Sequence, residues 1–339
     1  MAAGELNEKL TDLTRRQMLP KMPRAGWEGW FSILIARKGS PVRWTKTHLY
    51  RSRKIPFFHS MGATEGMTSA GEMLTLVGTK DRVYKDFSEF STYGVRTGDR
   101  NYSLTLDNLQ WNGECPSFQF DRHTADGKMK VRLDLKARDR IEWVGLPGVI
   151  TYFGLHSEAK GFIVANGERH EVRGLAVQEH AWGGLVPFDP LLVVRGRWQW
   201  DVLSFEEADG IGKIEEPTAL AGIWLPVPGR GSFGMRAEGR LPGTGYHKFR
   251  GYKVEYLETE KIESGHKGKP GIYPKRWLGT LSDSEGNLSY EAVASTPPAA
   301  VAPGGGFIGF DFEATYRPKS GSARKMSGSG FGEFGGVVK

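Results

Sequence analysis

The segment RGLAVQEHAWGG brings a carboxylic acid, an imidazole and an indole together as Glu179, His180 and Trp182. A carboxyl group that is held among Trp rings is desolvated, which raises its pKa and keeps a proton available near neutral pH. Such a group can act as a general acid. The same residues could instead satisfy buried backbone groups at a domain junction, because buried polar groups need hydrogen-bond partners.

Glu179 and His180 are adjacent, and adjacent residues of a β-strand point to opposite faces of the sheet. Only a bend or a bulge would therefore bring both side chains into one pocket. The following Ala-Trp-Gly-Gly favours such a bend. We expect Glu179 and His180 to be catalytic, with Trp182 beside the substrate.

Two other segments supply candidate site residues. WQWDVLSF places Trp198 and Trp200 on one strand face and Asp201 on the other. The two indoles are either core residues or a wall that stacks on an apolar or cationic species, and Asp201 is a second candidate acid. FFHSMGATEG is irregular, and loops often carry function, so it adds the catalytic candidates His59 and Glu65. Tyr152 and His156 are further candidates for substrate binding.

No cofactor or metal is expected from the motifs. The sequence has no P-loop, HExxH, GxSxG or dinucleotide-binding GxGxxG motif. Its eight histidines show no short ligand spacing, and isolated histidines on strands are more often hydrogen-bonded structural residues than metal ligands.

Composition and charge limit the partners. The 339 residues carry a formal charge of +7, but the basic residues are scattered among acids, which disfavours a nucleic-acid site and is compatible with peripheral membrane contact. No apolar run is long enough to span a membrane, and no secretion signal is present. The single cysteine, Cys115, excludes an internal disulfide. We expect a cytoplasmic protein that binds a hydrophobic small molecule.

The elements that must position these residues are mostly strands. KMKVRLDLKA alternates apolar and charged residues with period two, which predicts a half-buried strand. Asn112-Gly113, Asp126-Gly127 and Asn166-Gly167 are turn signals, and the last predicts a hairpin with a tight primed turn. Strands separated by short turns, without βαβ alternation, predict antiparallel sandwiches or barrels.

The end of a helical pattern and the proline-rich segments predict the domain organisation. Residues 1–22 are expected to form a helical segment, because ELNEKLTDLTRRQM has near-helical apolar spacing. The prolines of GLVPFDPL mark a crossing between two β domains, at residues 23–186 and 187–339. STPPAAVAPGGG, at residues 295–306, is expected to be a surface loop.

The order of a hairpin, a [DE]HxWG motif and a WxW strand resembles the AttH/CrtC-like group, which includes carotenoid 1,2-hydratases. The matching pieces here are QEHAWGG, RGRWQWDVLSF, the closing SGSGFGEFGG and the early GWEGWF. The chain departs from the group at Val177-Gln178, where an aromatic residue is usual, and at Glu179, where Asp is commoner. The resemblance implies an all-β fold of two lipocalin-like antiparallel β-barrel domains, with a ligand at or between them. It also implies a group that spans alkene hydration, pericyclic cyclisation and proteins of unassigned role.

The leading hypothesis is a cofactor-independent enzyme, a hydratase or dehydratase, that acts by acid-base chemistry at a C=C bond of an isoprenoid or polyketide-like substrate. Glu179 or Asp201 would donate the proton, and the Trp rings would stabilise the resulting cation. An isomerase or pericyclic cyclase that acts on a hydrophobic intermediate is the first alternative. A non-catalytic carrier of an apolar ligand is the second.

Overall fold

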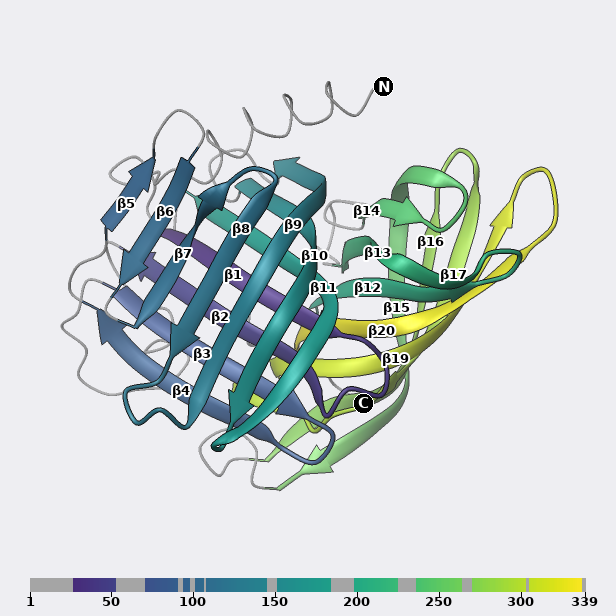
Figure 1. Ribbon diagram of the computed structural model, residues 1–339. Helices are drawn as coiled ribbons and strands as arrows, with labels where there is room; N and C mark the ends of the chain where they lie inside the picture. Colours follow the sequence, from purple (N-terminus) through teal and green to yellow (C-terminus); the bar gives the residue numbers. More distant parts are fainter. Residues whose placement is uncertain are drawn as a thin grey trace.

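The chain forms two antiparallel β-sheets, one from each half of the sequence (Figure 1). The computed structural model describes residues 27–52, 71–90, 94–97, 101–106, 108–144, 151–183, 198–224, 236–263, 270–302 and 305–336. The helical segment predicted at residues 1–22 lies outside these residues, as does the predicted domain boundary at 186/187. Within the described residues, no helix has the length and apolar character needed to cross a membrane.

The first sheet has eleven strands in the order β4-β3-β2-β1-β11-β10-β9-β8-β7-β6-β5. The strands are β1 (Trp27–Ala36), β2 (Val42–Ser52), β3 (Gly71–Thr79), β4 (Val83–Phe90), β5 (Gly94–Thr97), β6 (Asn101–Leu106), β7 (Leu109–Glu114), β8 (Ser117–His123), β9 (Met129–Val144), β10 (Thr151–Ala165) and β11 (Glu168–Gly183). Strand β11, which carries the Glu-His-Trp motif, pairs with β1 on one side and β10 on the other.

The second sheet has nine strands in the order β17-β16-β15-β14-β13-β12-β20-β19-β18. The strands are β12 (Trp198–Ala208), β13 (Gly212–Trp224), β14 (Arg236–Leu241), β15 (Gly245–Ile262), β16 (Gly271–Ser282), β17 (Gly286–Ala294), β18 (Ala299–Ala302), β19 (Gly305–Pro318) and β20 (Arg324–Gly335). An additional pairing between β17 and β19 closes this sheet into a ring. The prediction of an all-β chain with two antiparallel units is therefore confirmed.

The clearest sequence patterns form the expected elements. The alternating residues of KMKVRLDLKA lie in β9, whose apolar side chains enter the first core. Asn166 and Gly167 both have positive φ, at 53° and 85°, as the predicted primed hairpin turn between β10 and β11 requires. Asn112-Gly113 is not a turn, because both residues pair with β6 and β8 inside β7.

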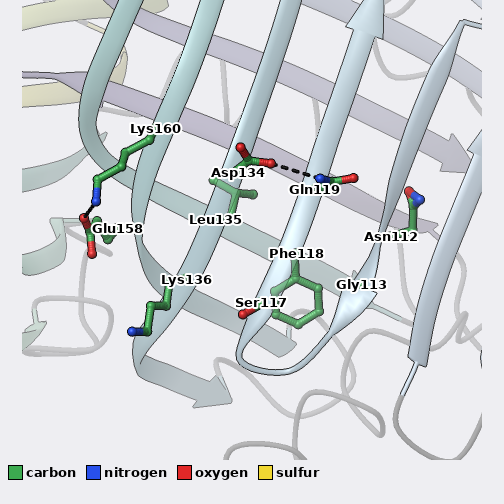
Figure 2. A pocket seen from close by; sticks show the side chains of 10 residues that line it. All are labelled: Asn112, Gly113, Ser117, Phe118, Gln119, Asp134, Leu135, Lys136, Glu158 and Lys160. Atoms are coloured by element: carbon green, nitrogen blue, oxygen red, sulfur yellow. Dashed lines mark hydrogen bonds and ion pairs between the residues drawn. The ribbon is translucent and has the colours of Figure 1, made fainter.

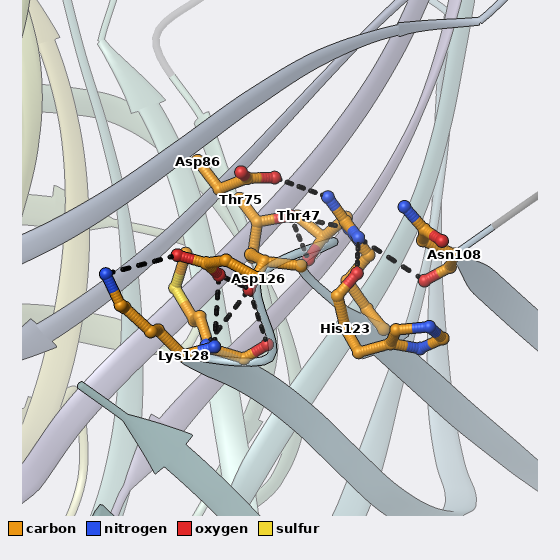
Figure 3. Close-up of polar contacts among 10 residues, drawn as sticks. Thr47, Thr75, Asp86, Asn108, His123, Asp126 and Lys128 are labelled. Atoms are coloured by element: carbon orange, nitrogen blue, oxygen red, sulfur yellow. Dashed lines mark hydrogen bonds and ion pairs between the residues drawn. The ribbon is translucent and has the colours of Figure 1, made fainter. Parts of the chain in front are cut away.

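The first sheet curves around its own core, so that strands far apart in the sheet face one another. One apolar cluster contains residues from β1 to β3 and from β6 to β11. The buried Arg122 of β8 reaches across this curve, where its Nε donates to Thr75 Oγ1 of β3 at 3.2 Å and its Nη2 donates to Asp86 Oδ2 of β4 at 2.5 Å (Figure 3). Figure 3 also shows Thr47 beside Thr75 in this group.

A second apolar cluster fills the ring of the second sheet, and a third lies between the two sheets. The third cluster joins β1, β2, β3 and β11 to β12, β13, β18, β19 and β20. The segment at residues 295–306 was expected to be a surface loop, and this expectation is wrong. Ala299 and Val301 of β18 are buried in the third cluster, because four small apolar residues follow the Pro pair and can pair with β19.

Candidate active site between the sheets

Strand β11 directs Glu179 and His180 to opposite faces of the first sheet. Its register is continuous, with Phe31 and Gly154 opposite Glu179 and with Trp30 and Phe153 opposite His180. The bend expected at Ala-Trp-Gly-Gly is absent up to Gly183, where the strand ends. The two residues therefore belong to separate clusters, Glu179 between the sheets and His180 inside the first.

Glu179 lies in a buried polar cluster between the sheets, which we call the interface cluster: Lys46, His48, Tyr152, Glu179 and Glu333. The Tyr152 hydroxyl of β10 donates to Glu179 Oε1 at 2.5 Å. Lys46 of β2 forms an ion pair with Glu333 of β20, so the cluster spans both sheets. Glu179 is 4% exposed and Lys46 is 2% exposed, so these charges are almost out of contact with water.

Strand geometry explains why these residues meet. In β2 the residues Trp44, Lys46 and His48 alternate with others and share the face that packs on the second sheet. Strand β1 separates β2 from β11, with Phe31 opposite both His48 and Glu179. The charge of Lys46 in β2 therefore acts on Glu179 across the width of one strand.

Burial dominates the electrostatics of the interface cluster. It raises the pKa of Glu179 to about 7, against the opposing effects of the Lys46 charge and the Tyr152 hydrogen bond. It lowers the pKa of Lys46 to about 7, where the charge of Glu179 acts in the opposite direction. Burial and the charge of Glu179 keep the pKa of Tyr152 well above 10, so this hydroxyl remains a proton donor.

His48 complements this acid. Burial, followed by the nearby Lys46 charge, lowers the pKa of His48 well below 6.5, so its imidazole is neutral at neutral pH. Its ring lies 4.1 Å from the ring of Phe31. The interface cluster thus holds an acid that is partly protonated at pH 7 beside a neutral imidazole.

Aromatic rings from both sheets surround the Lys46 ammonium. Its Nζ lies 5.1 Å from the centre of the Phe31 ring, 4.4 Å from that of Phe307 and 5.6 Å from that of Phe331. Trp200 packs at the edge of this group, with its ring 6.3 Å from that of Phe331. These π faces favour a positive charge in the cluster.

His180 and Trp182 lie inside the first sheet. His180 Nε2 is 3.3 Å from Glu28 Oε2, and both side chains are fully buried. The imidazole stacks on Trp30 at 4.6 Å and contacts Trp182 at 4.7 Å. This second cluster is compact and internally paired, as expected for residues that hold a strand in place.

Asp201 lies inside the second sheet, on the opposite face of β12 from Trp200, as the alternation of WQWDVLSF predicts. Its Oδ2 accepts from Tyr252 at 2.8 Å, Tyr290 at 2.5 Å and Trp277 at 3.0 Å, and its Oδ1 accepts from Gln199 at 2.7 Å. Burial raises the pKa of Asp201 in spite of these bonds. Four donors therefore surround this buried carboxylate inside the ring.

The remaining predicted residues are spread along the chain. His156 is two residues beyond Gly154 in β10, where burial lowers its pKa to about 4 against the opposing charge of Asp139. Trp198 begins β12 opposite Gly335 and is partly buried. His59 and Glu65 lie outside the described residues.

Sequence reasoning did not single out Lys46, His48 or Glu333. A signal was available for the first two in WTKTHLY, where Trp44, Lys46, His48 and Tyr50 occur at every second position. Glu333 belongs to the closing motif SGSGFGEFGG. No local pattern shows that these two strands meet, because the contact depends on how the sheets pack.

A surface groove of about 530 Å³ lies elsewhere, on the outer face of β7 to β10 (Figure 2). Its polar side chains already pair with each other: Gln119 donates to Asp134 at 3.1 Å, and Lys160 lies 2.6 Å from Glu158. The groove lacks the buried acid of the interface cluster. Among the described residues, no group of three or more His, Cys, Asp or Glu is arranged to hold a metal ion.

Several solved structures resemble this chain over most of its length. A protein designated AttH from Nitrosomonas europaea has a TM-score of 0.58 at 14% identity, covering 94% of this chain and 97% of its own. Kievitone hydratase from Nectria haematococca has a TM-score of 0.57 at 12% identity, covering 91% and 88%. CghA has a TM-score of 0.53 at 10% identity, covering 93% and 90%.

No family model and no curated protein matches the sequence itself. At these identities the structural likeness establishes the fold, and the activity needs separate evidence. The resemblance inferred from QEHAWGG and the WxW strand is therefore confirmed for the fold. The chain has the tandem β fold shared by the AttH protein, kievitone hydratase and CghA.

Proposed function

We propose that this protein is a cofactor-independent hydratase or dehydratase that acts at a C=C bond of a hydrophobic isoprenoid or polyketide-like molecule. The observation that carries this proposal is Glu179, a carboxyl group in a water-poor interface whose pKa is near 7. A general acid works best when its pKa is close to the working pH. Kievitone hydratase, which shares the fold, supports a hydration reaction.

Three residues of the interface cluster and the neighbouring Trp200 have roles in this mechanism. Glu179 donates its proton to one alkene carbon, and Tyr152 holds the carboxyl group in position through its hydrogen bond. The π face of Trp200 stabilises the cation that forms at the other carbon. Neutral His48 accepts a proton from the water that adds there. The product is an alcohol. Proton exchange with solvent then restores the proton of Glu179 and removes the one gained by His48. The same steps in reverse dehydrate an alcohol.

A pericyclic cyclase or isomerase is the second candidate, and the likeness to CghA favours it. In that reaction Tyr152 and protonated Glu179 would donate hydrogen bonds to a substrate carbonyl, and the surrounding side chains would hold the substrate in a reactive conformation. No oxygen would come from solvent. This difference separates the two candidates in a single labelling experiment.

The test is turnover of a panel of prenylated phenols and polyene ketones in H₂¹⁸O. We expect Glu179→Gln to lower the turnover by about 10² to 10⁴ fold, because Gln has no proton to donate. Glu171→Gln is the matched control, since Glu171 lies on the same strand and is 72% exposed. This control is expected to keep its activity, and both variants should fold as judged by thermal unfolding.

The isotope decides the reaction class. A hydratase incorporates ¹⁸O into the product, whereas a cyclase yields an isomer of the substrate without ¹⁸O. If the protein binds the ligand without converting it, and Glu179→Gln binds it with the same affinity, the protein is a carrier. Full turnover by Glu179→Gln would exclude Glu179 as the acid.

A further inference from the structure

A second group of side chains with catalytic geometry lies at one end of the second sheet, where the β14–β15 and β16–β17 turns meet. His247 Nε2 is 3.0 Å from Thr244 Oγ1, and His247 Nδ1 is 2.8 Å from Asp283 Oδ2. A hydroxyl, an imidazole and a carboxylate joined in this order form the signature of an activated nucleophile. We call these three residues the turn triad, and it shares no residue with the interface cluster.

The hydrogen bonds of Asp283 determine the direction of the relay. Asp283 Oδ1 accepts from the backbone N–H of Glu285 and of Gly286, both at 2.7 Å. Its Oδ2 accepts from His247 Nδ1, which leaves the lone pair of the neutral imidazole on Nε2. Thr244 Oγ1 can then donate to His247 Nε2 at 3.0 Å, as a nucleophile donates to its general base, and its alternative acceptor is Leu241 O at 3.5 Å.

The imidazole of His247 is buried and packed, whereas Thr244 is an exposed residue. His247 is buried, stacks on Phe249 with an interplanar angle of 9° and meets Tyr316 edge-on at 5.1 Å. Asp283 is also buried, with 6% of its side chain exposed. Thr244 is exposed in the tight turn between β14 and β15.

A cation and an apolar side chain lie against Gly243, the neighbour of Thr244. A Cβ at Gly243, whose φ is +67°, would lie 2.5 Å from Arg324 Nη1 and 2.8 Å from Ile211 Cδ1, so both side chains close on this turn. Arg324 is fixed by donating to Pro242 O at 2.8 Å. Ile211 is 48% exposed, an unusual exposure for a large apolar residue. A carbonyl oxygen that gains negative charge would be stabilised by Arg324, and an apolar group would contact Ile211.

We propose that the turn triad is a second catalytic site, which transfers acyl groups from small apolar esters to Thr244. The Thr244 oxygen attacks the ester carbonyl while its proton passes to His247. The ester C–O bond then breaks, and His247 returns this proton to the departing alcohol. Water releases the acyl group from Thr244 by the same route, so the net reaction is ester hydrolysis. The site and its chemistry do not depend on the function of the interface cluster.

The test uses p-nitrophenyl acetate with the full-length protein. We expect a burst of p-nitrophenol and an acetyl group on Thr244, located by peptide mass spectrometry. The label should be released by hydroxylamine, because an ester on Thr is labile and an amide on surface lysines is not. Thr244→Ser is expected to keep the label, and Thr244→Val to lose it with little change in melting temperature, since the side chain is exposed.

His247→Gln tests the relay, with Thr105→Val as the matched control. Thr105 is an exposed hydroxyl that neighbours Ser103 and has no imidazole partner in the described structure. We expect acetylation of Thr244 to fall at least tenfold in His247→Gln and to be unchanged in Thr105→Val. No hydroxylamine-labile label on Thr244, or equal labelling in folded His247→Gln, would show that the three residues only hold the two turns together.

Discussion

At the scale of single residues, Glu179 and Lys46 show how burial competes with charge pairing. Each lies in a dry interface, and each would be stabilised in its charged form by the other. Desolvation is the larger effect for both groups, so both pKa values move towards 7 from opposite sides. Both groups therefore change their protonation near neutral pH, whereas exposed groups of these types would stay ionised.

This shift predicts how stability depends on pH. The folded protein holds the Glu179 proton up to about pH 7, whereas the unfolded chain releases it near pH 4.5. Between these values the folded state binds more protons, so the contribution of Glu179 to the free energy of unfolding falls as pH rises. As the pH rises from 4.5 to 7, we expect the free energy of unfolding of Glu179→Gln to increase by about 1 to 3 kcal/mol relative to that of the native chain. Urea unfolding at several pH values measures this, and a difference that is constant with pH would contradict it.

For single residues, the sequence predicts the face of the strand but not the neighbours of the side chain. A period of two predicts that Trp200 and Asp201 point to opposite faces, and the structure confirms this separation. The bend that was expected to bring Glu179 and His180 together is absent, so the strand period holds for that pair as well. The sequence does not show which strand faces each side chain. Tyr152 was named as a ligand-binding candidate, but its bond to Glu179 depends on the register of β10 against β11.

At the scale of elements, strands with strong alternation and hairpins with two positive-φ residues could be predicted, as β9 and the β10–β11 turn illustrate. Asn112-Gly113 has the same composition as a turn and yet lies within β7. The following Cys115-Pro116 makes the turn to β8 instead, and strand pairing on both sides outweighs the local preference of Asn-Gly.

Trp44 of β2 depends on two glycines in neighbouring elements. A Cβ at Gly309 of β19 or at Gly78 of β3 would clash with its indole, whose Nε1 donates to Thr296 Oγ1 at 3.1 Å. We expect Gly309→Ala to lower the free energy of unfolding by about 1 to 3 kcal/mol through overpacking. The loss of unfolding free energy caused by Gly309→Ala should be smaller in a Trp44→Leu background, because the indole ring is absent there. A double-mutant cycle in urea measures this coupling, and additive effects would show that the contact with Trp44 is not the cause.

At the scale of the whole molecule, the two sheets are joined by an apolar layer and by ion pairs that cross it. Val177 and Phe331 are fully buried in this layer, and Arg43–Asp311 and Lys46–Glu333 bridge the two sheets beside it. A layer without exposed apolar surface favours concerted unfolding. The candidate active site is built from side chains of both sheets, so its geometry depends on this contact.

We therefore expect the protein to unfold in a single calorimetric transition, and Phe331→Asp to separate it into two. A charge in the layer disfavours the contact between the sheets but leaves the two inner cores intact, because Phe331 faces outward from the ring. Leu288→Ala is the control, since Leu288 is buried inside the ring and its loss should lower one shared transition temperature. A single transition in Phe331→Asp at a lower temperature would mean that the sheets fold as one unit without needing this layer. Turnover should be lost with the contact, because Trp200 of the second sheet would part from Glu179 and His48 of the first.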